Sequence, residues 1–303
     1  MRETIPDEPV IELLPREGGR RVGVYTLAQG GVGRAIVLCH AAPGSALFDP
    51  DPAQTHARGV TLLALDRPGY GLSDPMPSTE WATVATAADD LAAALDRIGA
   101  AQVGVAGWSA GGRVALALAA RRPELVDRVV VLATPAPHEQ VPWIPPEQAA
   151  GLEQLRDQPA DLAQVALAQQ LGQMLPPDAS DADLLGLLGS GEADAPALEM
   201  PGARERLLGM LRAAFAQGLD GLAADIAGYC LQPWGFAPEA VRAKTLLLYG
   251  SRDPTAGARH GSWWQQHLPN ARLEMVPGAG HLLIMPMWRR ALAHLAPNAR
   301  RSR

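Results

Sequence analysis

The sequence contains little cysteine, almost no lysine and no long apolar run. Its two cysteines, Cys39 and Cys230, are far apart among 303 residues and are expected to be free thiols rather than a disulfide framework. No apolar run approaches the roughly 20 residues that a helix needs to cross a bilayer. Lys244 is the only lysine and the net charge is -6, so the basic excess typical of nucleic-acid-binding proteins is missing.

The N-terminus also lacks the basic start and apolar centre of a secretory signal, because acidic residues occur at Glu3, Asp7 and Glu8. We therefore expect a cytoplasmic protein that binds neither nucleic acid nor a membrane. The length suits one large core with an insertion, which can bury a site for a small-molecule substrate. A monomer or a homodimer is expected.

Short apolar runs alternate with helical stretches along much of the chain. Continuous apolarity over four to seven residues is typical of strands buried on both faces. The alternation predicts an α/β fold with a mostly parallel central sheet flanked by helices. The predicted strands are residues 35–39, 60–65, 103–106, 129–133, 245–249 and 272–276, after an amphipathic strand pair around 21–27; the flanking helices include 82–98 and 110–122.

The alternation stops after residue 133 and resumes at 245. Between these positions, a proline-rich segment leads into helical patterns over residues 160–174, 181–188 and 203–217, without a strand pattern. The sequence therefore predicts a helical cap (lid), residues 137–237, inserted into a core made of residues 1–136 and 238–303.

The strongest local signal is the pentapeptide at 107–111, Gly-Trp-Ser-Ala-Gly, which follows a predicted strand and precedes a predicted helix. This is the G-x-S-x-G nucleophile elbow in its required context. Gly107 and Gly111 allow the strand and the helix to approach closely, and the sharp turn places Ser109 in a strained backbone conformation. Ser109 is the predicted nucleophile.

A serine hydroxyl needs a base to accept its proton as it attacks. Of the seven histidines, His281 has the best context, because it follows the glycine-containing loop 277–280 after the last predicted strand and precedes the final helix. A flexible loop at that place can present an imidazole. His281 is the predicted general base.

The imidazole in turn needs a carboxylate that fixes its tautomer. Asp253 lies just beyond the predicted strand 245–249, and the order Ser, Asp, His along the chain is the one that the α/β-hydrolase topology produces. Asp253 is the predicted acid. Glu139, after the preceding strand, is the reserve candidate.

The oxyanion that develops during acyl transfer needs two backbone N–H donors. One is expected to be the amide of Ala110, directly after the nucleophile. The other is expected from the loop after the strand 35–39, with Ala42 as donor, since Pro43 has no N–H and restrains the residue before it to an extended conformation.

Together these residues resemble the α/β-hydrolase family, in particular its lidded esterase, lactonase and peptidase-like branch. Relatives usually carry H-G-x-P-G-S in the oxyanion loop, and here Ala41 replaces the glycine. The run from Asp66 to Asp74 resembles the family's structural loop after a strand. The resemblance implies no metal and no organic cofactor, and the sequence offers no ligand-spaced His/Cys cluster or phosphate loop.

Large apolar side chains of the predicted cap, together with the neighbour of the nucleophile, are candidate walls of the substrate site. Few paired basic residues occur in the cap, which favours an uncharged, hydrophobic substrate. Packing of the cap against the core is the competing interpretation for each of these side chains. They are Trp108, Trp143, Met174, Phe215, Tyr229, Trp234 and Phe236.

The sequence thus predicts a serine hydrolase that cleaves a carboxylic ester of a small, largely hydrophobic substrate through an acyl-enzyme. A carbon–carbon bond hydrolase or a lactonase would use the same three side chains with a different pocket. An acyltransferase would pass the acyl group to an alcohol or amine, and a non-catalytic binding protein could retain the fold. These alternatives stay open at the level of sequence.

Overall fold

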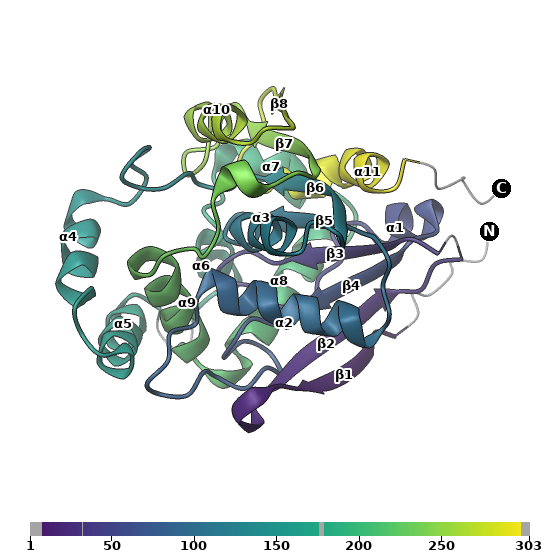
Figure 1. Ribbon diagram of the computed structural model, residues 1–303. Helices are drawn as coiled ribbons and strands as arrows, with labels where there is room; N and C mark the ends of the chain where they lie inside the picture. Colours follow the sequence, from purple (N-terminus) through teal and green to yellow (C-terminus); the bar gives the residue numbers. More distant parts are fainter. Residues whose placement is uncertain (1–7, 32, 176–178, 298–303) are drawn as a thin grey trace.

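The computed structural model describes residues 8–31, 33–175 and 179–297, and its centre is one sheet of eight strands (Figure 1). The order across the sheet is β1-β2-β4-β3-β5-β6-β7-β8. β2 pairs antiparallel with both of its neighbours, β1 and β4, whereas β3 to β8 are mutually parallel. The strands are β1 Val10–Pro15, β2 Arg21–Ala28, β3 Ala35–Cys39, β4 Thr61–Leu65, β5 Val103–Trp108, β6 Val126–Leu132, β7 Lys244–Gly250 and β8 Ala271–Val276.

Helices cover both faces of the sheet. α2 and α3 pack together on one face, with α10 beside β7 and β8, while α1 and α11 contact each other on the opposite face. The buried apolar runs of β3 to β7 lie between these layers, as expected for parallel strands. The helices are α1 Pro52–Arg58, α2 Val84–Arg97, α3 Gly111–Arg121, α10 Ala258–His267 and α11 Ile284–Leu295.

Between β6 and β7 the described residues form helices and loops without a strand. We call this part, from α4 to α9, the helical segment; α4, α5 and α9 lie on the left of Figure 1, far from α1 and α11. Its helices are α4 Pro146–Leu155, α5 Ala160–Met174, α6 Asp181–Gly186, α7 Ala195–Leu198, α8 Ala203–Ala214 and α9 Asp220–Leu231.

The predicted α/β architecture is confirmed. The strand pair expected around 21–27 is instead β2 at that place with β1, Val10–Pro15, as its partner, and further differences concern element ends. β6 begins at Val126, three residues earlier than predicted, because Asp127 and Arg128 interrupt the apolar pattern while the strand continues through them, with a register shift opposite Val103 and Gly104. α6 ends before the predicted residue 188, and Gly189 has a φ of 70°, a left-handed conformation in which glycine commonly follows a helix.

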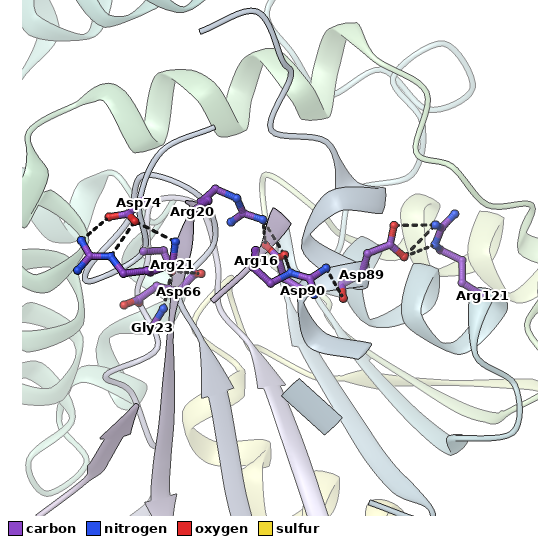
Figure 2. A network of polar contacts seen from close by, with 10 residues as sticks. Arg16, Arg20, Arg21, Gly23, Asp66, Asp74, Asp89, Asp90 and Arg121 are labelled. Atoms are coloured by element: carbon purple, nitrogen blue, oxygen red, sulfur yellow. Dashed lines mark hydrogen bonds and ion pairs between the residues drawn. The ribbon is translucent and has the colours of Figure 1, made fainter. Parts of the chain in front are cut away.

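An ion-pair network ties the β1–β2 hairpin to α2 and to the loop after β4 (Figure 2). Arg16 and Arg20 both donate to the buried carboxylate of Asp90, at 2.8 and 2.7 Å. Arg21 pairs with Asp74 nearby. The hairpin is therefore fixed to the core by charged groups as well as by the sheet.

No helix in the described ranges is long and apolar enough to cross a membrane.

Candidate active site

Three predicted side chains from the ends of three strands lie in one line of hydrogen bonds. Ser109 directly follows β5, Asp253 follows β7 and His281 follows β8. His281 Nε2 is 3.0 Å from Ser109 Oγ, and His281 Nδ1 is 2.8 Å from Asp253 Oδ2. The carboxyl ends of parallel strands meet at the same edge of a sheet, which brings residues 172 positions apart into contact.

The backbone at Ser109 has the strain that the sequence motif predicts. Its φ is 53°, in the left-handed region that non-glycine residues rarely adopt. A Cβ at Gly107 would lie 2.4 Å from the carbonyl oxygen of Gly111, and a Cβ at Gly111 would lie 2.1 Å from the carbonyl oxygen of Cys39. Only glycine at both positions lets β3, β5 and α3 approach this closely.

His281 is 2% exposed and is held from several sides. The indole Nε1 of the fully buried Trp108 donates to the carbonyl oxygen of His281 at 3.0 Å. A proton on Nδ1, donated to Asp253, leaves Nε2 as an acceptor for the hydroxyl of Ser109. This arrangement suits an imidazole that takes up the serine proton.

Asp253 is arranged to remain a carboxylate. Burial alone would raise its pKa, but hydrogen bonds from His281 and from the amides of Ala256 and Thr255 outweigh that effect and hold the pKa of Asp253 below its ordinary value. The ionised form can orient the imidazole and stabilise an imidazolium.

The loop after β3 lies beside the nucleophile and carries one of the two predicted oxyanion donors, Ala42; the other, Ala110, directly follows Ser109. Within the described part of the chain, no acceptor is found for the amide of Ala42 or of Ala110. Both N–H groups thus remain available to a ligand oxygen. A Cβ at Gly44 would lie 2.6 Å from the carbonyl oxygen of Ala41, so this loop is tightly folded.

A buried ion pair, not foreseen from the sequence, supports the loop after β3. Arg67 donates to the carbonyl oxygens of His40 and Ala41 at 2.6 and 2.8 Å, and two further bonds, of 2.9 and 2.8 Å, join it to Asp225 of α9. Burial would lower the pKa of Arg67, but the charge of Asp225 outweighs burial and raises it. Arg67 belongs to the run 66–74 that resembles the family's loop after a strand, but no sequence pattern marked Arg67 or Asp225 as members of a buried pair.

A cavity of about 670 Å³ lies between the helical segment and α3. Trp143, Tyr229 and Trp234, three of the predicted wall residues, line it together with Arg113. The guanidinium carbon of Arg113 is 3.7 Å from the ring centre of Tyr229 and 3.9 Å from that of Trp234, so aromatic rings cover this buried cation. Ser109, His281 and Asp253 are not among the residues that line this cavity.

The remaining predicted wall residues lie elsewhere. Trp108 is buried beneath His281, and Phe215 packs with Ala42 against one apolar cluster. Met174, at the end of α5, is 61% exposed and does not line the cavity. Phe236 stacks on Trp234, and the reserve acid Glu139 is exposed at the cavity, whereas Asp253 is the carboxylate beside the imidazole.

Within the described ranges, no group of three or more His, Cys, Asp or Glu side chains is placed to hold a metal ion.

A second buried histidine makes stability depend on pH. His260 Nδ1 accepts a hydrogen bond from the amide of Ala136 at 3.0 Å, and burial lowers the pKa of His260 to about 4. Below pH 6.5 the unfolded chain binds a proton here that the folded chain does not, so stability falls as the pH drops from 6.5 to about 4. One such proton changes the free energy of unfolding by up to about 1.4 kcal/mol per pH unit.

We expect the His260→Gln variant to lose this part of the pH dependence. Urea unfolding of both proteins at several pH values between 4 and 7 measures it. The difference in stability between wild type and variant should change with pH inside this window and stay constant above it. Curves that remain parallel throughout would contradict the assignment.

Comparisons with known proteins agree with the fold described above. Residues 34–286 match the family model described as the alpha/beta hydrolase fold. A pimeloyl-[acyl-carrier protein] methyl ester esterase of Nitrosomonas europaea is 30% identical over 259 residues, which cover 83% of this chain and 90% of the relative.

Two solved structures share the fold at lower sequence identity. A hydrolase from Pseudomonas aeruginosa superimposes with a TM-score of 0.69 at 23% identity, covering 93% of this chain and 97% of its own. An esterase from Exiguobacterium antarcticum gives 0.68 at 15% identity, with coverage of 93% and 97%. The family match over most of the chain and the shared architecture lead to one conclusion: this chain belongs to the α/β-hydrolase fold family.

Proposed function

We propose that the chain is a serine esterase that hydrolyses a carboxylic ester of a small, largely hydrophobic acid through an acyl-enzyme. The observation that carries the proposal is the line of hydrogen bonds from Ser109 Oγ through His281 to Asp253, at 3.0 and 2.8 Å. Relatives named as methyl ester esterases support an ester as the bond that is cleaved.

In the proposed reaction, Ser109 Oγ attacks the ester carbonyl while His281 Nε2 accepts the hydroxyl proton. The carbonyl oxygen becomes an oxyanion and accepts hydrogen bonds from the amides of Ala42 and Ala110. The imidazolium then gives its proton to the leaving alkoxide, which departs as an alcohol. Water attacks the acyl-enzyme by the same route, releasing the acid and restoring Ser109, while Asp253 holds the imidazole throughout.

The apolar character of the proposed substrate is supported by aromatic side chains of the helical segment that lie against the proposed oxyanion donors. Phe215 packs with Ala42 against one apolar cluster, and the hydroxyl of Tyr229 donates to the carbonyl oxygen of Ala110 at 3.3 Å. Aromatic surroundings of this kind favour a hydrophobic group.

A panel of p-nitrophenyl esters tests this function. We expect turnover that is highest for uncharged acyl chains, together with covalent labelling of Ser109 by a fluorophosphonate probe. Preference for charged acyl groups would contradict the hydrophobic substrate. Failure of Ser109 to react would favour a binding protein on the same fold, and acyl transfer to an added alcohol in preference to water would favour an acyltransferase.

A further inference from the structure

A carboxylate from the helical segment is buried against the loop that carries His281. Asp194 ends the short 3₁₀ helix Glu192–Asp194 between α6 and α7 and is 1% exposed. Its Oδ1 accepts from the amide of Leu282 at 2.8 Å, and its Oδ2 accepts from the amide of His281 at 3.2 Å. A third bond, of 3.0 Å, comes from Gly191 in its own turn.

The partners of this carboxylate are backbone amides rather than a cation. No Arg, Lys or His lies within ion-pair distance of Asp194 among the residues that the structure describes. The amides of His281 and Leu282 precede α11, which begins at Ile284, and N–H groups at that end of a helix have no partner inside it. Asp194 therefore supplies, from 88 residues away, an acceptor that this loop lacks locally.

The same contact explains why residue 280 is a glycine. A Cβ at residue 280 would lie 2.4 Å from Oδ2 and 2.5 Å from Oδ1 of Asp194. The glycine before the histidine thus makes room for the carboxylate. The loop is held against a fixed group, whereas the sequence alone suggested a freely flexible one.

We infer that Asp194 is a positioning residue for the base, and that it couples the placement of the helical segment to catalysis. The inference rests on the proposed function of Ser109 and His281. Trp108 fixes the carbonyl of His281 and Asp253 fixes Nδ1, both from the core, while Asp194 fixes the amide from the helical segment. Together these contacts hold Nε2 at 3.0 Å from Ser109 Oγ, a distance at which small shifts strongly affect proton transfer.

The Asp194→Asn variant tests the inference. Asparagine retains one oxygen acceptor of the same reach, but its NH₂ faces an amide N–H that is then left without a partner. We expect kcat to fall about 10- to 100-fold, the range that misplacement of a catalytic group produces, with KM changed less than about twofold. The acidic limb of the pH profile of kcat/KM should shift, and Asp194→Leu should lower kcat further than Asn does.

Glu192→Gln is the matched control, because Glu192 lies in the same short helix and is exposed. It should retain wild-type kcat and KM. An Asp194→Asn enzyme that is folded and has wild-type kcat would overturn the inference, as would a rise in KM alone. Hydrogen exchange of the peptide 278–284 adds a readout that does not depend on turnover: faster exchange in the variant supports the contact, and unchanged exchange overturns it. A wild-type protein without turnover or labelling would instead refute the proposed function.

Discussion

Replacing Ser109 with alanine is expected to lower kcat for ester hydrolysis on the order of 10⁴- to 10⁶-fold, as loss of the nucleophile does in other serine hydrolases. The hydroxyl is the group within 3.0 Å of His281 Nε2, and the variant leaves the imidazole with nothing to deprotonate except water. Alanine keeps the Cβ of serine, so the left-handed backbone at this position carries no new strain. Steady-state kinetics on the best ester of the panel, with circular dichroism as a test of folding, measures the effect.

The control for this variant is Ser262→Ala, because Ser262 is exposed on α10. It should keep wild-type activity. Esterase activity that survives Ser109→Ala at more than a few per cent would mean that another residue is the nucleophile.

The Asp225→Ala variant should show a large loss of stability. Arg67 and Asp225 are 7% and 8% exposed, and removal of the carboxylate leaves a buried guanidinium without its counter-charge. Breaking a buried pair in this way typically costs about 3–5 kcal/mol. Urea denaturation should therefore give a clearly lower midpoint for Asp225→Ala.

The catalytic activity of Asp225→Ala should also be lower than that of the wild type, even at urea concentrations at which the variant is still folded. Arg67 also donates to the carbonyls of His40 and Ala41, so its displacement disturbs the loop with the proposed donor Ala42. Glu153→Ala, which removes an exposed pair with Arg156, should change stability by only about 0–1 kcal/mol. Equal unfolding midpoints for Asp225→Ala and Glu153→Ala would contradict the importance of the buried pair.

The sheet could be predicted because strands that are buried on both faces appear in the sequence as short, continuous apolar runs. The runs in β3, β5 and β7 are continuously apolar, and each ends where the chain turns toward a functional loop. The nearness of Ser109, Asp253 and His281 follows from this same pattern, since parallel strands end at one edge. The start of β6 does not show in the sequence pattern because Asp127 and Arg128, at the beginning of this strand, are polar and only half-buried.

The supporting aspartates could not be predicted in this way. Asp225 lies in α9, whose composition is apolar on nearly every side, and Asp194 lies in a single turn of 3₁₀ helix. The periodicity of apolar residues identifies the buried face of a helix. It does not show which acidic side chain will pair with a distant cation such as Arg67, or accept a hydrogen bond from a distant backbone amide. The same limit applies to Met174, since the local sequence does not determine how a helix of the insertion is oriented over the core.

The stacking of Arg113 between Tyr229 and Trp234 restricts how a substrate can gain entry. A hinge motion that swung α9 away from the core would expose this cation and both rings, and it would also separate Asp225 from Arg67. Because α9 is held to the core by two contacts, Tyr229 with Arg113 and Asp225 with Arg67, we expect the substrate to enter through a local rearrangement elsewhere in the helical segment. We therefore expect α9 to stay attached to the core while a substrate enters.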